Sequence, residues 1–556
     1  MRRNTSSTPW LAACGTALAL LLAACGGGGI GSGGTGSEMA VGTVDGFGSI
    51  FIGGDRCDDV GAPITFDTVP GGPEPATADI KLGQRVEADL DGNSATCKIL
   101  AARISPELVG VVSATSPLTV AGAQVLVNSD PLIGPVTVLD GYDSVADIQV
   151  GDRVEVHGKA VAVNGGVAVR ATRIERKPST DTWVRVAGVV QNLDSNALTF
   201  TLGALTVHYG LGTTILPPNL ALANGQTVAM WSLGPVTNNA VDARFIRVLR
   251  RNFPNRSAVR IEGPVSGCGG TSPCTQFVID GVSVVITAAT QFTIGTPGDV
   301  TDGRTLHVRG TFDAANGVLV ASAVAARQRD PNAGVITLIG TVSEFASAGS
   351  ETNFRVRGVP VSTDANTVIQ AGCTIDDGQL VGIAGHIVGS SVLATHIDCV
   401  ALAVGTVVDA YGAVQNLDTV ASTFRLTLGP VLSNATLEWD EHTVFGNGLT
   451  AATLANGQFV GVRAVFVGNG RFLLLRVILD DTPPASPTGG LVFGTFGIAH
   501  DITASGLAVG RIPMAITGNT VIRAGVGNGV VVRAWFYRDV INQRWVALLV
   551  RPAPLY

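Results

Sequence analysis

The arginine-rich segment at 244–260 is the strongest local concentration of charge in the chain. Its cationic residues are Arg244, Arg247, Arg250, Arg251, Arg256 and Arg260, with Phe245 and Phe253 between them. Guanidinium groups donate paired hydrogen bonds to phosphates and carboxylates. The segment could therefore hold lipopolysaccharide or an acidic glycan. Because Arg244, Arg247 and Arg250 are three residues apart, they cannot share one strand face, and a solvated boundary between two repeats is the favoured interpretation.

A second candidate site consists of three aromatic residues near the C-terminus, Trp535, Tyr537 and Trp545. Trp535 and Tyr537 are two residues apart, which places them on one face of a strand. Trp545 follows on the returning strand, beyond a turn at 539–542. These rings could stack on a sugar or on a nucleobase. Terminal repeats more often use aromatic residues to close their own core, and that is the favoured alternative.

No sequence pattern supports catalysis. The sequence contains no HExxH, GxSxG, P-loop or paired CxxC motif, and a nucleophile next to a base is not recognisable. His386 and His396 fall in one repeat and could meet, although exposed strand positions are favoured for both. We therefore expect a protein that is not an enzyme and that has neither a cofactor nor a metal site. The seven histidines share no common repeat position: they are His157, His208, His307, His386, His396, His442 and His500.

Six of the eight cysteines fall into pairs within single repeats. The pairs are Cys57/Cys97, Cys268/Cys274 and Cys373/Cys399. Six cysteines allow fifteen pairings, and pairing within each repeat is the simplest arrangement in an oxidising compartment. Metal binding is the alternative, but CxxC spacing and neighbouring histidines are missing. We predict three structural disulfides.

The N-terminus resembles a bacterial lipoprotein signal. Arg2 and Arg3 precede an apolar stretch at 10–24, which is too short for a transmembrane span. The stretch ends in Leu-Ala-Ala-Cys-Gly at 22–26, which resembles a lipobox. That resemblance implies cleavage before Cys25 and lipidation of Cys25, and multiple acyl chains give stable membrane attachment. Cys14 has similar neighbours, but only polar residues precede them. Gly26 in place of Asp favours the outer membrane of a Gram-negative bacterium, and the Gly-rich residues that follow form a flexible tether.

Composition argues against a nucleic-acid partner. The chain has a net charge of −7, with 14% charged residues, whereas binding to phosphate backbones requires a basic face. Hydrophobic residues make up 46% of the chain and glycine accounts for 71 residues. After position 24 the apolar residues are dispersed rather than gathered in one long run. This composition suits many small β-cores separated by turns.

Two glycine-centred patterns recur along the chain. The first is apolar-Gly-x-apolar, at Gly42, Gly110, Gly188, Gly263, Gly340, Gly405 and Gly494. The second precedes a closing strand, at Gly83, Gly151, Gly225, Gly303, Gly378, Gly457 and Gly529. A Thr-x-apolar step precedes the second glycine from the third repeat on, as at Thr290, Thr367 and Thr520. Recurrence at steps of 68 to 79 residues predicts seven tandem repeats.

Each repeat shows the period of two that β-strands require, for example at 153–157 and 424–428. Single helical turns are expected at most, at 78–82 and 145–148. Five or six short strands in about 70 residues fit a small closed barrel, which removes exposed edges. The prediction is an all-β array of OB-like barrels. A small sandwich is the alternative, and a solenoid or propeller fits the repeat length less well.

The combined pattern Gly-x-Val, Thr-x-Ile, Gly-Gln-x-Val and Ala-x-x-Ile resembles a bacterial family of tandem OB-like domains of unknown function. Members are secreted proteins and lipoproteins, and the likeness is closest in the third to sixth repeats. The family implies no catalytic residues.

The predicted boundaries follow from these patterns. They are a signal peptide at 1–24, a lipidated Cys25 with its tether at 25–40, repeats at 41–108, 109–182, 183–257, 258–333, 334–402 and 403–479, a Pro-rich linker at 480–490 and a last repeat at 491–556. The linker is semi-rigid, and we expect it to allow the last repeat some independent motion.

These observations predict a lipid-anchored protein of the cell envelope that acts as a non-catalytic structural or interaction module. Its expected partners are the membrane, through the lipid, and an envelope glycan or a protein. The alternative function is binding of envelope glycan or lipopolysaccharide through the arginine segment and the C-terminal aromatic residues.

Overall fold

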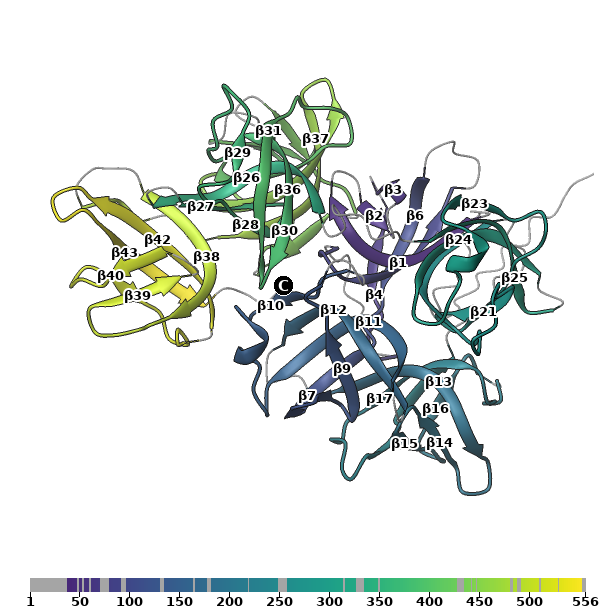
Figure 1. Ribbon diagram of the computed structural model, residues 1–556. Helices are drawn as coiled ribbons and strands as arrows, with labels where there is room; N and C mark the ends of the chain where they lie inside the picture. The colour runs from purple at the N-terminus through teal and green to yellow at the C-terminus, as the bar shows by residue number, and fades with distance from the viewer. Residues whose placement is uncertain are drawn as a thin grey trace, which may run out of the picture. The chain divides into compact units, whose positions relative to one another are not determined.

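The computed structural model is an all-β protein (Figure 1). Its only helices among the described residues are single 3-10 turns, η1 (Val145–Asp147) and η2 (Pro297–Asp299). No helix in the described part of the chain is long and apolar enough to cross a membrane. The structure describes residues 38–552, with gaps at 48–49, 53–54, 60–61, 71–79, 92–96, 131–134, 164–165, 178–181, 219, 249–257, 314–315, 327–334, 349–350, 428–434, 442, 447, 481–483, 488–491, 510–511 and 529.

One barrel illustrates the strand order of the others. β7 (Leu108–Thr115) pairs antiparallel with β8 (Leu118–Val120), and β8 pairs with β9 (Ala123–Val127). β9 then pairs in parallel with β12 (Gly166–Arg176), which pairs with β11 (Arg153–Val163). β11 returns to β7 and closes the circuit. A closed five-stranded barrel with this crossed order is OB-like, which confirms the predicted fold class at the level of the single barrel.

Several further barrels follow the same order, and each is named here after its first strand. In Figure 1, the strands of the β38 barrel are drawn in yellow and those of the β1 barrel in purple. In order of pairing, the β1 barrel consists of β1 (Glu38–Phe47), β2 (Ile50–Ile52), β3 (Asp55–Asp58), β6 (Cys97–Ile104) and β5 (Arg85–Leu90), and the β20 barrel of β20 (Ala258–Ser266), β21 (Gln276–Ile279), β22 (Val282–Val285), β25 (Val318–Ala326) and β24 (Thr305–Asp313). The β26 barrel consists of β26 (Val335–Ala348), β27 (Glu351–Val356), β28 (Val359–Ser362), β31 (Ser391–Cys399) and β30 (Leu380–Val388), and the β32 barrel of β32 (Val407–Asp418), β33 (Thr423–Leu426), β34 (Thr436–Glu438), β37 (Arg471–Leu479) and β36 (Phe459–Gly468). The β38 barrel consists of β38 (Val492–His500), β39 (Gly506–Val509), β40 (Ile512–Ala515), β43 (Arg544–Pro552) and β42 (Val531–Asp539).

The β13 barrel departs from this plan because its final strand is divided. Its first strands are β13 (Val184–Asp194), β14 (Thr199–Leu202) and β15 (Leu205–His208), followed by β17 (Thr227–Ser232). The first part of the final strand, β18 (Ala240–Asp242), pairs with β15, whereas the second part, β19 (Phe245–Val248), pairs with β17.

A short additional strand lies parallel to the last strand of each barrel. Its members are β4 (Ile64–Phe66), β10 (Val138–Asp140), β16 (Thr214–Leu216), β23 (Gln291–Ile294), β29 (Val368–Ile369), β35 (Val444–Gly446) and β41 (Val521–Ile522). In all but the β1 barrel, a threonine immediately precedes this strand and its Oγ1 donates to a carbonyl at 2.6–2.7 Å. These donors are Thr137, Thr213, Thr290, Thr367, Thr443 and Thr520. The Thr-x-apolar pattern is therefore a side-chain clip, and it also occurs in the β7 barrel, where it was not predicted.

The second recurring glycine connects the closing strand to the first strand. Gly151 donates its N–H to the carbonyl of Val112 at 2.9 Å, and Val112 donates to the carbonyl of Asp152 at 2.8 Å. Gly151 has a φ of 96°, and an added Cβ would meet nothing within 4 Å. The positive φ, rather than a lack of room for a side chain, therefore favours glycine at position 151.

The hydrogen bonds between the two recurring patterns confirm the predicted position of the first glycine in the first five repeats and correct it in the last two. In the β32 barrel the residue joined to Gly457 is Val414, so the equivalent of Gly110 is Gly412 and not Gly405. In the β38 barrel Ala499 donates to the carbonyl of Val530, which makes Gly497 the equivalent in place of Gly494. Both incorrect positions have the same apolar-Gly-x-apolar letters, and only the pairing register separates them.

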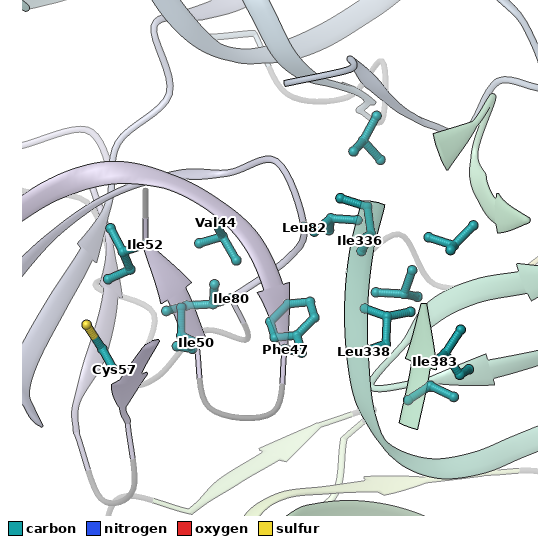
Figure 2. Close-up of a cluster of buried hydrophobic side chains, with 14 of the residues drawn as sticks. Val44, Phe47, Ile50, Ile52, Cys57, Ile80, Leu82, Ile336, Leu338 and Ile383 are labelled. Atoms are coloured by element: carbon teal, nitrogen blue, oxygen red, sulfur yellow. The ribbon is translucent and has the colours of Figure 1, made fainter. Parts of the chain in front are cut away.

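Hydrophobic cores extend across barrel boundaries. One buried cluster contains Val44, Phe47 and Leu82 of the β1 barrel together with Ile336 and Leu338 of the β26 barrel (Figure 2). A second cluster joins the β7 and β13 barrels. β1 also pairs in parallel with β20, and β7 pairs with β13. Neighbouring barrels are therefore stabilised by shared apolar burial.

The predicted single turns and the linker are described only in part. The turn expected at 145–148 is present as η1, whereas residues 80–82 form no helix and 78–79 lie outside the described residues. Asp480, at the start of the Pro-rich linker, is held by ion pairs to Arg533 and Arg551 of the β38 barrel.

Candidate functional site

The predicted arginine site does not form one open cationic surface among the described residues. Arg247 pairs with Asp67 of the β1 barrel, and Arg244 Nη1 donates to the carbonyl of Gly212. The Arg244 guanidinium also lies 5.7 Å from the ring centre of Phe245. Arg250 and Arg251 lie outside the described residues. Arg247 therefore joins the β13 barrel to the β1 barrel, which is a different contact from the predicted solvated boundary between the third and fourth repeats.

Asp67 receives a second arginine. Arg185 Nη2 lies 2.5 Å from Asp67 Oδ2, and the two side chains are 2% and 0% exposed. Burial raises the pKa of the Asp67 carboxyl, but the Arg185 and Arg247 guanidinium groups outweigh this effect and hold that pKa below its usual value. The carboxylate is thus charged in the folded protein at neutral pH.

The three C-terminal aromatic residues do not share an open face. Trp535 is 2% exposed, and the guanidinium groups of Arg533 and Arg551 lie 4.5 and 5.7 Å from its ring centre. Trp545 is 8% exposed and packs edge-on against Phe536, with ring centres 5.1 Å apart. Tyr537 is half-buried. Trp545 belongs to the hydrophobic core of the last barrel, which favours core closure for this residue. Trp535 is not part of that core and lies against the two arginines.

The predicted disulfides are confirmed. Cys57–Cys97, Cys268–Cys274 and Cys373–Cys399 are bonded within the β1, β20 and β26 barrels. Cys25 lies outside the described residues.

The histidines that the structure describes occupy separate environments. His157 is fully buried, and its Nε2 lies 2.9 Å from Glu155 Oε1. Burial lowers the pKa of His157 despite the adjacent Glu155 carboxylate. His386 and His396 are not opposite each other, because His386 faces Leu393 while His396 faces Ala384. Within the described ranges, no group of three or more His, Cys, Asp and Glu side chains could hold a metal ion.

Buried ion pairs join several barrels. The Arg85 side chain is 1% exposed, and it pairs with Glu107 of the β7 barrel and with Asp280 of the β20 barrel. Lys159 of the β7 barrel pairs with Glu262 of the β20 barrel at 3.2 Å. Removing one partner of a buried pair leaves an uncompensated charge and costs about 3–5 kcal/mol. These pairs therefore restrict which barrel faces can meet.

A cavity of about 190 Å³ lies among side chains of the β1, β7, β26, β32 and β38 barrels. Part of its wall is apolar, including Val138, Val359 and Ile478. The rest is densely charged. The cationic residues that line it are Lys81, Arg173, Arg355, Arg357, Arg463, Arg476, Arg533 and Arg551, and the carboxylates are Asp140, Glu175, Glu344 and Asp409.

At this cavity, strand pairing places arginines opposite each other in two pairs. Arg463 on β36 lies directly opposite Arg476 on β37, and Arg533 on β42 lies opposite Arg551 on β43. Like charges at opposite positions destabilise a sheet, so such pairs require anions near them. Asp480 supplies one, since it pairs with both Arg533 and Arg551.

Asp409 and Tyr411 complete one wall of the cavity. Arg463 Nε and Nη2 donate to the two Asp409 oxygens at 2.7 and 3.2 Å. The Tyr411 hydroxyl donates to Glu344 Oε1 at 3.1 Å, and the Arg533 guanidinium lies 4.7 Å from the Tyr411 ring centre. Burial raises the pKa of Tyr411 well above its usual value, so its hydroxyl remains a donor.

The sequence did not reveal this cavity, because its residues come from separate repeats. Each arginine occupies an ordinary polar position in an alternating strand. The only local signal is the Arg-x-Arg step at Arg355 and Arg357 on the third repeat from the C-terminus.

Four segments of the chain match the model described as "Domain of unknown function (DUF5666)", at residues 109–175, 262–325, 339–398 and 411–477. The chain carries the DUF5666 domain four times. Each DUF5666 segment begins in the first strand of a barrel and ends in its last strand, in the β7, β20, β26 and β32 barrels. The third predicted repeat was expected to be among the closest to the family but lies outside these matches. Its last strand is divided into β18 and β19, unlike those of the four matched barrels.

Two solved structures were compared with the chain. "Drosophila Unr CSD456" is 11% identical, with 40% of this chain and 98% of that chain covered and a TM-score of 0.10. A multidomain protein with nucleic acid binding domains from Streptococcus pneumoniae is 10% identical, with 39% and 73% covered and a TM-score of 0.12. The OB-like assignment therefore depends on the strand pairings of this chain. No curated protein matches the chain.

Proposed function

We propose that the protein is a lipid-anchored, non-catalytic structural or interaction module of the bacterial cell envelope, built from seven OB-like units. The observation that carries the proposal is the connection of barrels by shared cores and buried ion pairs. The cluster that contains Phe47 and Leu338 spans two barrels, and Arg85 contacts two barrels beyond its own. Such contacts suit a protein that presents a fixed surface.

Lipid attachment at Cys25 is part of the proposal. The lipobox-like residues at 22–26 and the Gly-rich residues that follow support it. A protein anchored in this way to the outer membrane would display its barrels on one side of that membrane. Disulfides in three barrels are consistent with the oxidising envelope.

The anchoring test compares two cysteine variants of the full chain in a Gram-negative host. We expect Cys25→Ser to abolish incorporation of labelled palmitate and to release the chain from the membrane fraction. The matched control, Cys14→Ser, should leave both unchanged. Unaltered palmitate labelling in Cys25→Ser would contradict the proposed anchor.

Hydrogen exchange of the full chain tests whether neighbouring barrels behave as one module. Because the β1 and β26 barrels share a core, we expect their unfolding to be coupled. Leu338→Ala should lower the protection from hydrogen exchange of strands in both barrels. If only the β26 barrel responded, the barrels would be independent and the proposed fixed surface would be wrong.

A further inference from the structure

The β13 barrel has an open groove where the strand before its divided last strand ends early. In the β26, β32 and β38 barrels the corresponding strand pairs with the last strand as far as the hairpin tip. In the β13 barrel the pairing of β17 with β19 stops at Trp231 and Phe245, and residues 233–239 connect β17 to β18. One isolated bridge joins Thr237 to Ala240. The hairpin therefore bulges away from β18 and leaves a gap beside it.

The gap forms a groove of about 780 Å³ within this one barrel. The ends of β15 and β18 line it, together with parts of the loops that follow β15 and β17. Small-molecule sites usually have volumes of about 300–1,000 Å³, so the groove has room for such a ligand. Bulges that interrupt a strand pairing are frequent next to functional sites, because they redirect side chains.

Polar side chains in the groove have hydrogen-bonding groups to spare. His208 on β15 lies opposite Asp242 on β18. Both are exposed, whereas their neighbours Val207 and Val241 are buried, so the pair faces outward. Within the described part of the chain, the side chains of His208 and Asp242 and the hydroxyl of Tyr209 make no hydrogen bond or ion pair. A bound molecule can therefore use all three.

Donors and acceptors lie side by side in this groove. Asp242 supplies carboxylate oxygens that accept, whereas Arg244 and Tyr209 supply donors. Arg244 Nη1 donates to the carbonyl of Gly212, which fixes the guanidinium at the groove. The ring of Tyr209 packs against the buried ring of Phe200, with ring centres 5.9 Å apart, and this contact positions its hydroxyl. Because a carboxylate and a guanidinium occur together, the groove suits a neutral ligand whose groups both donate and accept.

The remaining walls are small or apolar. Leu233 is 56% exposed and Pro235 is also exposed. Glycines 210, 212 and 234 contribute no side chains to the walls, which leaves space for a ring. A sugar ring has an apolar C–H face and a border of hydroxyls that donate and accept. Leu233 and Pro235 can contact the C–H face while the polar side chains bind the hydroxyls. A nucleic acid fits less well, because Asp242 repels phosphates.

We propose that the groove of the β13 barrel binds a short neutral oligosaccharide. Asp242 and Arg244 bind ring hydroxyls, the Tyr209 hydroxyl adds a further hydrogen bond, and Leu233 contacts the C–H face. The site goes beyond the proposed function and does not depend on lipid anchoring. It lies within one barrel, so it does not depend on the contacts between barrels either.

Isothermal titration of the full chain, in a detergent without a sugar headgroup, tests the site. The probes are neutral disaccharides and trisaccharides of glucose, galactose, mannose and N-acetylglucosamine, compared with an oligogalacturonate, a thymidine oligonucleotide and trialanine. We expect a neutral oligosaccharide to bind most tightly, with an affinity that salt hardly changes because the ligand carries no charge. Absence of binding by every neutral oligosaccharide would overturn the proposal. Tighter binding of the oligogalacturonate, the oligonucleotide or trialanine would overturn it as well.

Two aspartates on last strands provide a matched pair of variants. Asp242 lines the groove, whereas Asp398 on β31 of the β26 barrel is 46% exposed and lies beside a histidine, His396. We expect Asp242→Ala to weaken binding of the tightest neutral oligosaccharide about tenfold or more, because hydrogen bonds to a charged group are lost. Asp398→Ala should leave the affinity unchanged. Equal affinities of the two variants would contradict the site.

Tyr209→Phe guards against misfolding, since it removes one hydroxyl and keeps the ring that packs against Phe200. We expect this variant to bind the same oligosaccharide several-fold more weakly, through loss of one hydrogen bond. The melting temperature of each variant without ligand identifies any loss of folding. If Asp242→Ala does not fold, the result for Tyr209→Phe decides. Unchanged affinity in Tyr209→Phe overturns the proposal.

Discussion

Replacing Asp67 with asparagine tests whether buried ion pairs hold the barrels together. The Asp67 side chain is fully buried and pairs with Arg185 and Arg247 of the β13 barrel. The asparagine side chain would have nearly the same shape but no charge. The Arg185 guanidinium, which is 2% exposed, would then be buried without its carboxylate.

The expected cost is about 3–5 kcal/mol, the usual result of removing one partner of a buried pair. At about 1.36 kcal/mol per factor of ten, this corresponds to a local opening equilibrium about 150 to 5,000 times more favourable. The effect should be confined to the region of Asp67 and to β13 and β19, where its two partners lie. Barrels without contact to this pair should be unchanged.

Hydrogen exchange of the full chain, resolved by peptide, measures this local opening. The control is Glu438→Gln, which breaks an ion pair with the exposed Arg471 and should leave exchange nearly unchanged because surface pairs contribute little. A loss of protection below about fivefold in Asp67→Asn would refute the reasoning. So would an equal loss in the control.

The same variant predicts a change in pH dependence. The pKa of Asp67 is lower in the folded chain than in the unfolded chain, so the unfolded state binds the proton more readily. The stability from Asp67 is therefore fully present above about pH 4 and is lost as pH falls through the lowered pKa. Below about pH 4 the wild-type protein should lose protection at β13, and Asp67→Asn should show little of this loss.

Three further predictions concern the recurring features of the barrels. Thr367→Val should destabilise the β26 barrel by about 1–3 kcal/mol through loss of the clip, and Thr367→Ser should restore most of it in urea unfolding. Gly457→Ala should destabilise the β32 barrel by about 1–2 kcal/mol because its φ is 87°, whereas Gly518→Ala, with open space around it, should be nearly neutral by the same measurement. Replacing both cysteines of the disulfide Cys57–Cys97 with alanine should lower the free energy of unfolding by about 4 kcal/mol, and the same change at Cys268–Cys274 should lower it by about 2 kcal/mol. The difference arises because the first disulfide closes a longer loop. Reversal of that order in calorimetry would contradict the chain-entropy account.

The sequence by itself determined the local features of each barrel. Alternating residues such as those of β11 and β24 specify strands, because successive side chains in a strand point to opposite faces. Gly151 and Thr367 mark the glycine junction and the threonine clip because these features depend on one backbone conformation or on one hydroxyl. The disulfides were also predictable, since each pair lies within one repeat.

Only the tertiary structure decided how distant repeats use their polar residues. Arg247 was recognised as an unusual charge, but its partner Asp67 lies 180 residues away and has no local signal. Arg476 and Arg533 occupy ordinary strand positions, and they line one cavity because strands of separate barrels meet there. Trp535 alternates with Tyr537 as an exposed pair would, yet neighbouring arginines and the rest of the fold bury it. Strand periodicity is a local property of the chain, whereas the burial and charge environment of a side chain depend on which barrel lies against it.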